Sequence, residues 1–257
     1  MSTTRLHPVP ATTKGTHAML DIARSELVQI FRNRLVLVTG LIIPAAAGGY
    51  FVYQHETFSE LGSPGYIAAI VMFTVMAFGL YTTAVTTLAS RRQDLFLKRL
   101  RSTAASDQSI LAGLVLPVVV LSLVQVVAIL TVFAVVTGNP ARIPLLVVAI
   151  LATTAMMGAL ALATAGLTNS PEHAQVTTLP VSLAVIAVAS WVGISGTEEL
   201  GYLKRLLPGG SATELVVHAW DGGVPLVESL SLVLPTMAWV AIAVALAGRL
   251  FQWEPRR

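Results

Sequence analysis

The sequence predicts an all-α membrane protein with six transmembrane helices, and three observations support this fold class. Hydrophobic residues make up 55% of the 257-residue chain and charged residues only 11%, whereas soluble domains carry about 25% charged residues. Six intervals without Asp, Glu, Lys or Arg each reach the roughly 20 residues that a helix needs to cross a bilayer. Lys and Arg are also distributed unequally between the two predicted sides of the membrane, as in multi-pass proteins.

The six transmembrane helices are placed inside these charge-free intervals. Clusters of Gly, Pro, Asn and Ser at residues 62–65, 138–140 and 169–171 separate neighbouring intervals, and such clusters favour turns over continued helix. The expected spans are residues 35–54, 65–89, 110–137, 144–168, 174–194 and 230–249.

The basic residues predict that both chain ends lie in the cytoplasm, as tails at 1–16 and 251–257. In this orientation 13 of the 16 Lys and Arg residues are cytoplasmic, and only Arg142, Lys204 and Arg205 are outside, as the positive-inside rule requires. The asymmetry accounts for the basic isoelectric point, near 9.5, without a nucleic-acid partner. The Ala, Val and Leu content and the basic tails indicate a bacterial plasma (inner) membrane.

The segment before the first span predicts an amphipathic helix over residues 17–34. Apolar and basic side chains recur there at helical spacing on different sides, which suits a helix lying in the cytoplasmic membrane interface. An ordinary juxtamembrane extension is the alternative. The residues that define the two sides are Leu20, Leu27 and Phe31 on the apolar side and Arg24 and Arg32 on the polar side.

The cytoplasmic loop at residues 91–101 is rich in charge but also contains Leu95, Phe96, Leu97 and Leu100. A topology signal alone would explain its basic residues. It would not explain four large apolar side chains facing the cytoplasm. An early acid and late bases suit a short helix, and we expect this helix to dock onto a soluble partner.

The connection at 195–229 is too apolar for an exposed loop and too interrupted by Pro and Gly for a transmembrane helix. We expect two short helices that lie in, or dip into, the outer leaflet, because irregular backbone at that depth must be shielded by protein or line a watery cavity.

The sequence lacks the residues that would support catalysis. It contains no Cys, and the interiors of the predicted spans contain no Asp, Glu, Lys or Arg, which proton- or ion-coupled carriers usually place inside the membrane. No His, Asp or Glu cluster has metal-ligand spacing, and no G-x-x-x-x-G-K-[ST] phosphate-binding motif is present. We therefore expect a non-catalytic chain without a metal or cofactor of its own.

The order of these features resembles the permease subunits of ABC-2 type exporters, over residues 17–250. The resemblance rests on the amphipathic helix that runs into the first span, on the Leu-Lys-Arg-Leu-Arg-Ser-Thr run at 97–103, and on the elements around 207–210. It implies that residues 17–34 form the connecting helix and that short re-entrant helices precede the sixth span. The cytoplasmic loop would then be the coupling helix that contacts a separate ATPase subunit through Arg91, Arg92, Asp94, Leu95, Phe96, Leu97, Lys98, Arg99, Leu100 and Arg101.

The resemblance also implies the partners and the activity. ATP and Mg would bind the separate ABC ATPase, and a second permease subunit, identical or a sister chain, would complete the pathway. Transport would be export of a drug, antibiotic or lipid-like compound. The uncharged spans favour a hydrophobic or amphipathic substrate.

The second span has a polar but uncharged face that includes Thr82, Thr83, Thr86 and Thr87. This face suggests a lining for the transport pathway. Packing and hydrogen bonding between helices is the alternative role for such residues. The candidate lining residues are Met72, Phe73, Met76, Thr82, Thr83, Gln125, Thr177 and Thr178. The alternatives to an exporter permease are a secondary carrier and a non-transporting membrane assembly or sensor subunit.

Overall fold

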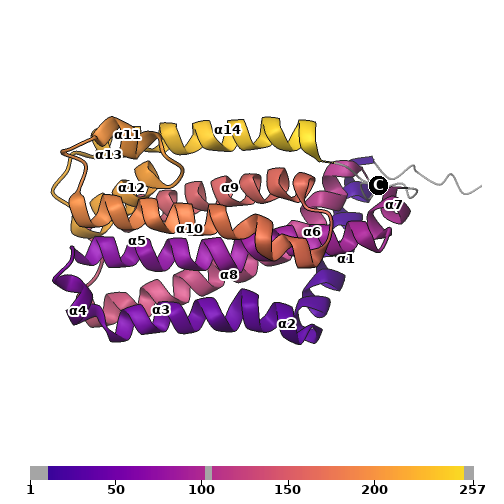
Figure 1. The fold of residues 1–257 in the computed structure, drawn as a ribbon, viewed down its shortest axis with the longest axis horizontal. Helices are drawn as coiled ribbons and strands as arrows, with labels where there is room; N and C mark the ends of the chain where they lie inside the picture. The colour runs from indigo at the N-terminus through magenta and orange to yellow at the C-terminus, as the bar shows by residue number, and fades with distance from the viewer. Residues whose placement is uncertain (1–10, 102–105, 252–257) are drawn as a thin grey trace, which may run out of the picture.

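The structure is a computed structural model that describes residues 11–101 and 106–251; the side chains at 11–18, 35, 98 and 101 lie outside the described part. Every regular element within these residues is a helix, and the helices form an elongated bundle (Figure 1). The all-α prediction is therefore confirmed for the described residues. The predicted tails at 1–10 and 252–257 lie outside them.

The helices follow one another with short connections. In chain order they are α1 (Ala11–Arg32), α2 (Arg34–Leu37), η1 (Val38–Ile42), α3 (Ile43–Tyr53), α4 (His55–Ser59), α5 (Pro64–Val75), η2 (Met76–Thr82), α6 (Thr83–Gln93), α7 (Phe96–Arg101), α8 (Asp107–Thr137), α9 (Ile143–Leu167), α10 (Pro171–Ser195), α11 (Gly201–Leu206), α12 (Gly210–Asp221), α13 (Leu226–Ser231) and α14 (Val233–Leu250). The segments η1 and η2 are π-helical.

Five helical stretches in the described residues are long and apolar enough to cross a membrane. They are Pro64–Gln93, Asp107–Thr137, Ile143–Leu167, Pro171–Ser195 and Leu226–Leu250. A shorter apolar helix, Val38–Tyr53, occupies most of the first predicted span. These findings establish a multi-pass helical membrane protein.

Side-chain caps and turn residues explain where several of these helices begin and end. Ser63, Ser106 and Ser170 precede α5, α8 and α10, and each hydroxyl accepts a hydrogen bond from the backbone N–H three residues later, which satisfies a donor that the first helical turn leaves open. Gly138 ends α8 with φ of 103°, a backbone conformation that favours glycine.

The continuous helix formed by α5, η2 and α6 lies at the centre of the bundle. Almost nine tenths of its apolar stretch is buried inside the protein, against about one sixth for Leu226–Leu250. It packs against α3, α8, α9, α10 and α12. The other spans therefore present most of the lipid-facing surface, and the central helix is shielded from lipid by protein.

Two predicted segments differ from the structure in their boundaries. The helix α1 begins at Ala11 rather than at residue 17, so part of the predicted tail is helical. The segment 91–101 is not one helix: α6 continues to Gln93, and α7 begins at Phe96.

The connection at 195–229 contains three short helices, α11, α12 and α13, instead of the two predicted. The helix α12 does not lie on the lipid surface. It packs against α5, α9 and α10, and most of its residues are buried. Figure 1 places α11, α12 and α13 at the end of the bundle opposite α1, α7 and the last turn of α14. We call these two ends the α12 end and the α7 end.

Candidate coupling surface and polar cavity

The junction between α6 and α7 exposes a leucine at the α7 end. Leu95 has φ of 56°, in the left-handed region that costs non-glycine residues roughly 1 kcal/mol. This conformation forms part of the two-residue turn that separates α6 from α7. It leaves the Leu95 side chain 47% exposed, beside the exposed Asp94.

The predicted ATPase-coupling residues separate into three groups by exposure. The separation follows from the turn, which directs one side of α7 toward the bundle. Asp94, Leu95 and Arg99 are exposed, Arg91, Phe96 and Leu100 are partly buried, and Arg92 and Leu97 are buried; the side chains of Lys98 and Arg101 lie outside the described residues.

Arg92 is buried inside the chain, with only 2% of its side chain exposed. Its Nη2 donates hydrogen bonds to the carbonyl oxygen of Ala165, at 2.7 Å, and to that of Thr168. Both carbonyls belong to the C-terminal end of α9, where a cation complements the helix dipole and satisfies carbonyls that lack helical partners. Arg92 therefore joins the central helix to α9.

Arg91 forms an ion pair with Glu26 of α1. The Arg91 Nε lies 2.7 Å from Glu26 Oε1, and Nη2 donates to Glu26 Oε2 at 2.9 Å and to Gln29 Oε1. Glu26 is only 1% exposed, so this pair is strongly shielded on the acidic side. The Arg91 guanidinium also lies 5.5 Å from the ring centroid of Phe96. Arg91 thus connects α1, α6 and α7.

The helix α1 has one face against the bundle and an apolar face outward. Ile22, Glu26 and Ile30, spaced by four, are buried, and α1 lies so close to α8 that a Cβ on Gly113 would stand 2.8 Å from the Met19 carbonyl oxygen. The predicted apolar residues Leu20, Leu27 and Phe31 are exposed, as are Arg24 and Arg32. This arrangement suits a membrane interface.

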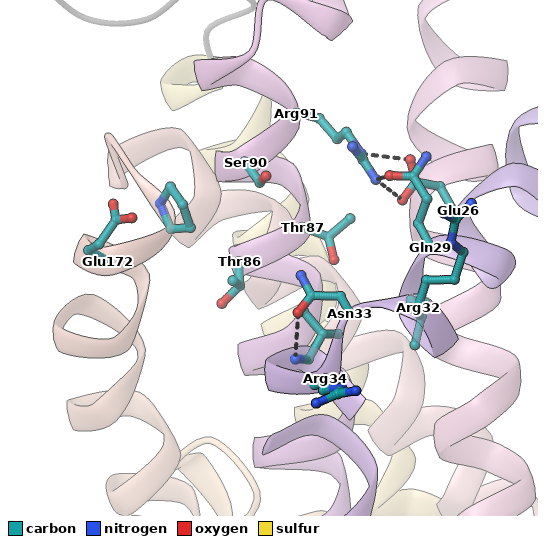
Figure 2. A pocket seen from close by; sticks show the side chains of 13 residues that line it. Glu26, Gln29, Arg32, Asn33, Arg34, Thr86, Thr87, Ser90, Arg91 and Glu172 are labelled. Carbon is teal, nitrogen blue, oxygen red and sulfur yellow. Dashed lines mark hydrogen bonds and ion pairs between the residues drawn. The ribbon is translucent and has the colours of Figure 1, made fainter. Parts of the chain in front are cut away.

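A polar cavity of about 660 Å³ opens between α1, α6 and the beginning of α10. Figure 2 shows Thr86, Thr87 and Ser90 of α6 between the α1 side chains and Glu172 of α10. Its charged lining residues are Glu26, Glu172, Arg32, Arg34 and Arg91. Acids, bases and hydroxyls together can accommodate the polar part of an amphipathic molecule.

The candidate pathway residues do not gather on one surface of this chain. Met72, Phe73 and Met76 are fully buried in the core. In this conformation they form no part of the surface of the chain. Thr82 contacts Ser182 of α10 at 3.4 Å between hydroxyl oxygens. The others are placed as follows: Thr83 bonds to the Phe78 carbonyl, Gln125 to the Leu41 carbonyl, Thr177 to the His173 carbonyl and Thr178 to the Ala174 carbonyl.

A charged network at the α12 end was not anticipated from the sequence. Glu214 of α12 is 5% exposed and accepts hydrogen bonds from Arg205 Nε at 2.7 Å, Arg205 Nη2 at 2.6 Å and Thr197 Oγ1 at 2.7 Å. Burial favours the neutral carboxyl, but these donors outweigh it and hold the pKa of Glu214 below its ordinary value. At His218, one turn later, burial also favours the neutral form, which for an imidazole lowers the pKa.

Lys204 is the second buried charge in this region, at 2% exposure. Its Nζ donates to Ser195 Oγ at 2.9 Å and to the Gly196 carbonyl at 2.6 Å, and it lies 5.2 Å from the Trp191 ring centroid. Lys204 therefore caps the end of α10. The sequence signal was the basic pair at 204–205, nine to ten residues before Glu214, inside an otherwise apolar segment.

Among residues 11–101 and 106–251, no group of three or more His, Cys, Asp or Glu is arranged to hold a metal ion. At the α7 end, two arginines of the central helix instead connect it to other helices. Arg91 pairs with Glu26 of α1, and Arg92 binds carbonyl oxygens at the end of α9.

Comparison with known proteins agrees with the resemblance that the sequence motifs indicated. No curated protein matches the chain significantly. The description "ABC-2 type transporter" belongs to the protein family whose sequence model matches residues 19–192, from α1 to the last turn of α10. Since this match covers more than half of the chain, the protein belongs to the ABC-2 type transporter family.

Proposed function

We propose that this protein is the transmembrane permease subunit of an ATP-driven exporter in the bacterial plasma membrane. It moves a hydrophobic or amphipathic compound outward, using a separate ATPase subunit that binds ATP and Mg. The observation that carries the proposal is the exposed Leu95 at the turn between α6 and α7, in a chain whose family is that of ABC-2 type transporters.

The proposed topology has six spans and cytoplasmic chain ends. Residues 34–53 are helical without interruption through α2, η1 and α3, and 20 residues at 1.5 Å each extend about 30 Å, the thickness of the hydrocarbon core. Figure 1 shows α1 and the C-terminal end of α14 at the same end of the bundle, as an even number of crossings requires. Arg142, Lys204 and Arg205 belong to the opposite, external end.

The ATPase contact is proposed to centre on Leu95 and the adjoining exposed residues of α7. A movement of α7 would reach the transmembrane part directly, because α7 follows the central helix after a two-residue turn. Arg91 and Arg92 would pass that movement to α1 and α9, which they hold through Glu26 and through the carbonyls at the end of α9.

A second permease subunit, identical or a sister chain, is proposed to complete the pathway. The polar cavity between α1, α6 and α10 is the proposed entry site for the substrate, since α1 and the last residues of α6, which line it, lie at the α7 end (Figure 1). Its mixed charges suit an amphipathic compound with a polar group and suit a uniform polyanion less well.

The test is co-purification of the tagged full-length chain from mild detergent, compared with two single variants. Leu95→Asp places a charge in the proposed contact, and Asp adopts the left-handed conformation more readily than Leu. Leu61→Asp is the matched control, because Leu61 is 51% exposed at the α12 end, against 47% for Leu95.

Wild type and Leu61→Asp are expected to retain a stoichiometric soluble ATPase. Leu95→Asp should weaken its binding by about tenfold or more, as loss of an interface anchor does. Equal ATPase recovery from both variants would contradict the contact. A wild-type chain that purifies alone and transports with a proton gradient would replace the proposal with a secondary carrier.

A further inference from the structure

Two π-helical segments face each other inside the bundle, one in each of two neighbouring helices. η1 packs against η2, and π-turns of this kind are often found at functional positions. Gly40 and Gly79 permit this contact: a Cβ on Gly79 would stand 3.2 Å from the Gly40 carbonyl oxygen. The wide turns and the missing side chains leave space between the helices.

Three oxygen atoms from separate parts of the chain converge at this space. They are the Gly40 carbonyl oxygen, Ser122 Oγ and Gln125 Oε1, which lie 3.2, 3.3 and 3.4 Å from the position that a Cβ on Gly79 would take. Buried acceptors normally have a hydrogen-bond donor, from the protein or from ordered water.

The Gln125 side chain provides independent support for a missing partner. It is only 6% exposed, and its Nε2 donates to the Leu41 carbonyl at 2.9 Å, which fixes the orientation of the amide. Its Oε1 is buried and has no hydrogen-bond partner among the described residues. An unsatisfied buried acceptor costs about 1–3 kcal/mol.

A small cavity adjoins these atoms, and Gln125 lies just outside its lining. Its polar lining includes Gly40, Thr83 and Ser122, and Gly79 forms part of its wall. Its volume is about 10 Å³, which is close to the minimum that one water molecule requires. The rest of its lining is apolar, and two of these residues, Ile30 and Val36, also line the polar cavity beside α1.

We propose that one water molecule is bound between η1 and η2. It donates to Gln125 Oε1 and to the Gly40 carbonyl and accepts from the Ser122 hydroxyl, so it uses three of its four hydrogen bonds, as buried waters commonly do. A cation fits less well, because none of the lining residues carries a negative charge and a buried charge without a counter-charge is costly.

The bound water joins the first and second spanning helices with α8. Direct contacts between π-turns would have to break before the two helices could move past each other. A water molecule can exchange its hydrogen-bonding partners as the helices move. The bound water therefore lets the two helices shift against each other while their polar groups stay hydrogen-bonded. This inference does not depend on which ATPase or substrate the protein uses.

The test is X-ray hydroxyl-radical labelling of the full-length protein in nanodiscs, read by mass spectrometry. Radicals formed from a bound water label the side chains next to it, even where bulk solvent does not reach. Val118 lines the cavity and is 2% exposed. Val126 is the internal control, because it lies on the same helix, is fully buried and does not line the cavity.

Val118 is expected to be labelled several-fold more than Val126. Gly79→Ala fills the point where the oxygens converge and should abolish the difference. Ser122→Ala, which keeps the space and removes only one hydroxyl, should reduce it and serves as the variant that folds most readily. Equal labelling of the two valines in the wild type would overturn the proposal, as would a Val118 signal that appears only with added sodium ions.

Discussion

The packing of α9 against α14 offers a comparison of two identical substitutions in one helix. A Cβ on Gly166 would stand 2.7 Å from the Leu250 carbonyl carbon, 2.8 Å from its oxygen and 2.9 Å from the Phe251 nitrogen. All three atoms are backbone atoms, so no side-chain rotation can relieve the contact. A Cβ on Gly158, in the middle of the same helix, would meet no atom within 4 Å.

The expected magnitude follows from these distances. Ordinary contact begins at 3.4 Å, so the end of α14 would have to retreat by 0.7 Å, the difference between 3.4 and 2.7 Å. Such overpacking costs about 1–3 kcal/mol. Gly→Ala in a helix interior stabilises by about 0.5–1 kcal/mol, and this gain applies to both variants. Gly158→Ala should therefore be more stable than wild type, and Gly166→Ala about 1–3 kcal/mol less stable than Gly158→Ala.

The assay is equilibrium unfolding in mixed detergent micelles, followed by circular dichroism. A difference of 1.4 kcal/mol is a tenfold change in the unfolding equilibrium, so the predicted range is readily measured. If Gly166→Ala unfolds at the same denaturant fraction as Gly158→Ala, the close approach of α14 to α9 does not exist in solution and the reasoning fails.

Three further predictions concern buried charges. Arg92→Met should destabilise the protein by about 2–4 kcal/mol in the same unfolding assay, because two carbonyls of α9 lose a charged donor; a loss below 0.5 kcal/mol would contradict its buried position. A double-mutant cycle of Glu26→Gln and Arg91→Met should give a coupling energy of about 1–3 kcal/mol, and additive effects would show that the ion pair contributes nothing. Both Glu214 and His218 have a lowered pKa in the folded state, so the unfolded state binds more protons and stability must fall as the pH falls. Thermal stability should decline below about pH 6.5 through His218 and again below about pH 4.5 through Glu214, their ordinary values, and His218→Asn should remove only the first decline.

The positions of the long helices could be predicted because lipid and backbone impose local requirements. Long apolar helices lie at Pro64–Gln93, Asp107–Thr137, Ile143–Leu167 and Pro171–Ser195, each over one of the charge-free intervals. Ser63, Ser106 and Ser170 cap three of them from adjacent positions. The need to satisfy every backbone hydrogen bond in lipid acts within a single segment, so a single sequence contains it.

The roles of individual charged and apolar side chains could not be predicted in the same way. The loop at 91–101 was interpreted as one exposed helix, yet Arg92 and Leu97 are buried and Leu95 takes a left-handed conformation. The pathway residues Met72 and Phe73 are likewise fully buried. Their surroundings come from α9, α10 and α12, which lie far along the chain.

The sequence by itself determined the membrane class, the order of the helices and the family, because hydropathy, turn chemistry and the short basic motif are properties of neighbouring residues. Only the tertiary structure decided that α12 is buried, that Glu214 pairs with Arg205, and that Glu26 pairs with Arg91. The physical reason is that a buried charge is stable only beside a partner, and the partner's proximity depends on how helices pack, which spacing along one chain does not specify.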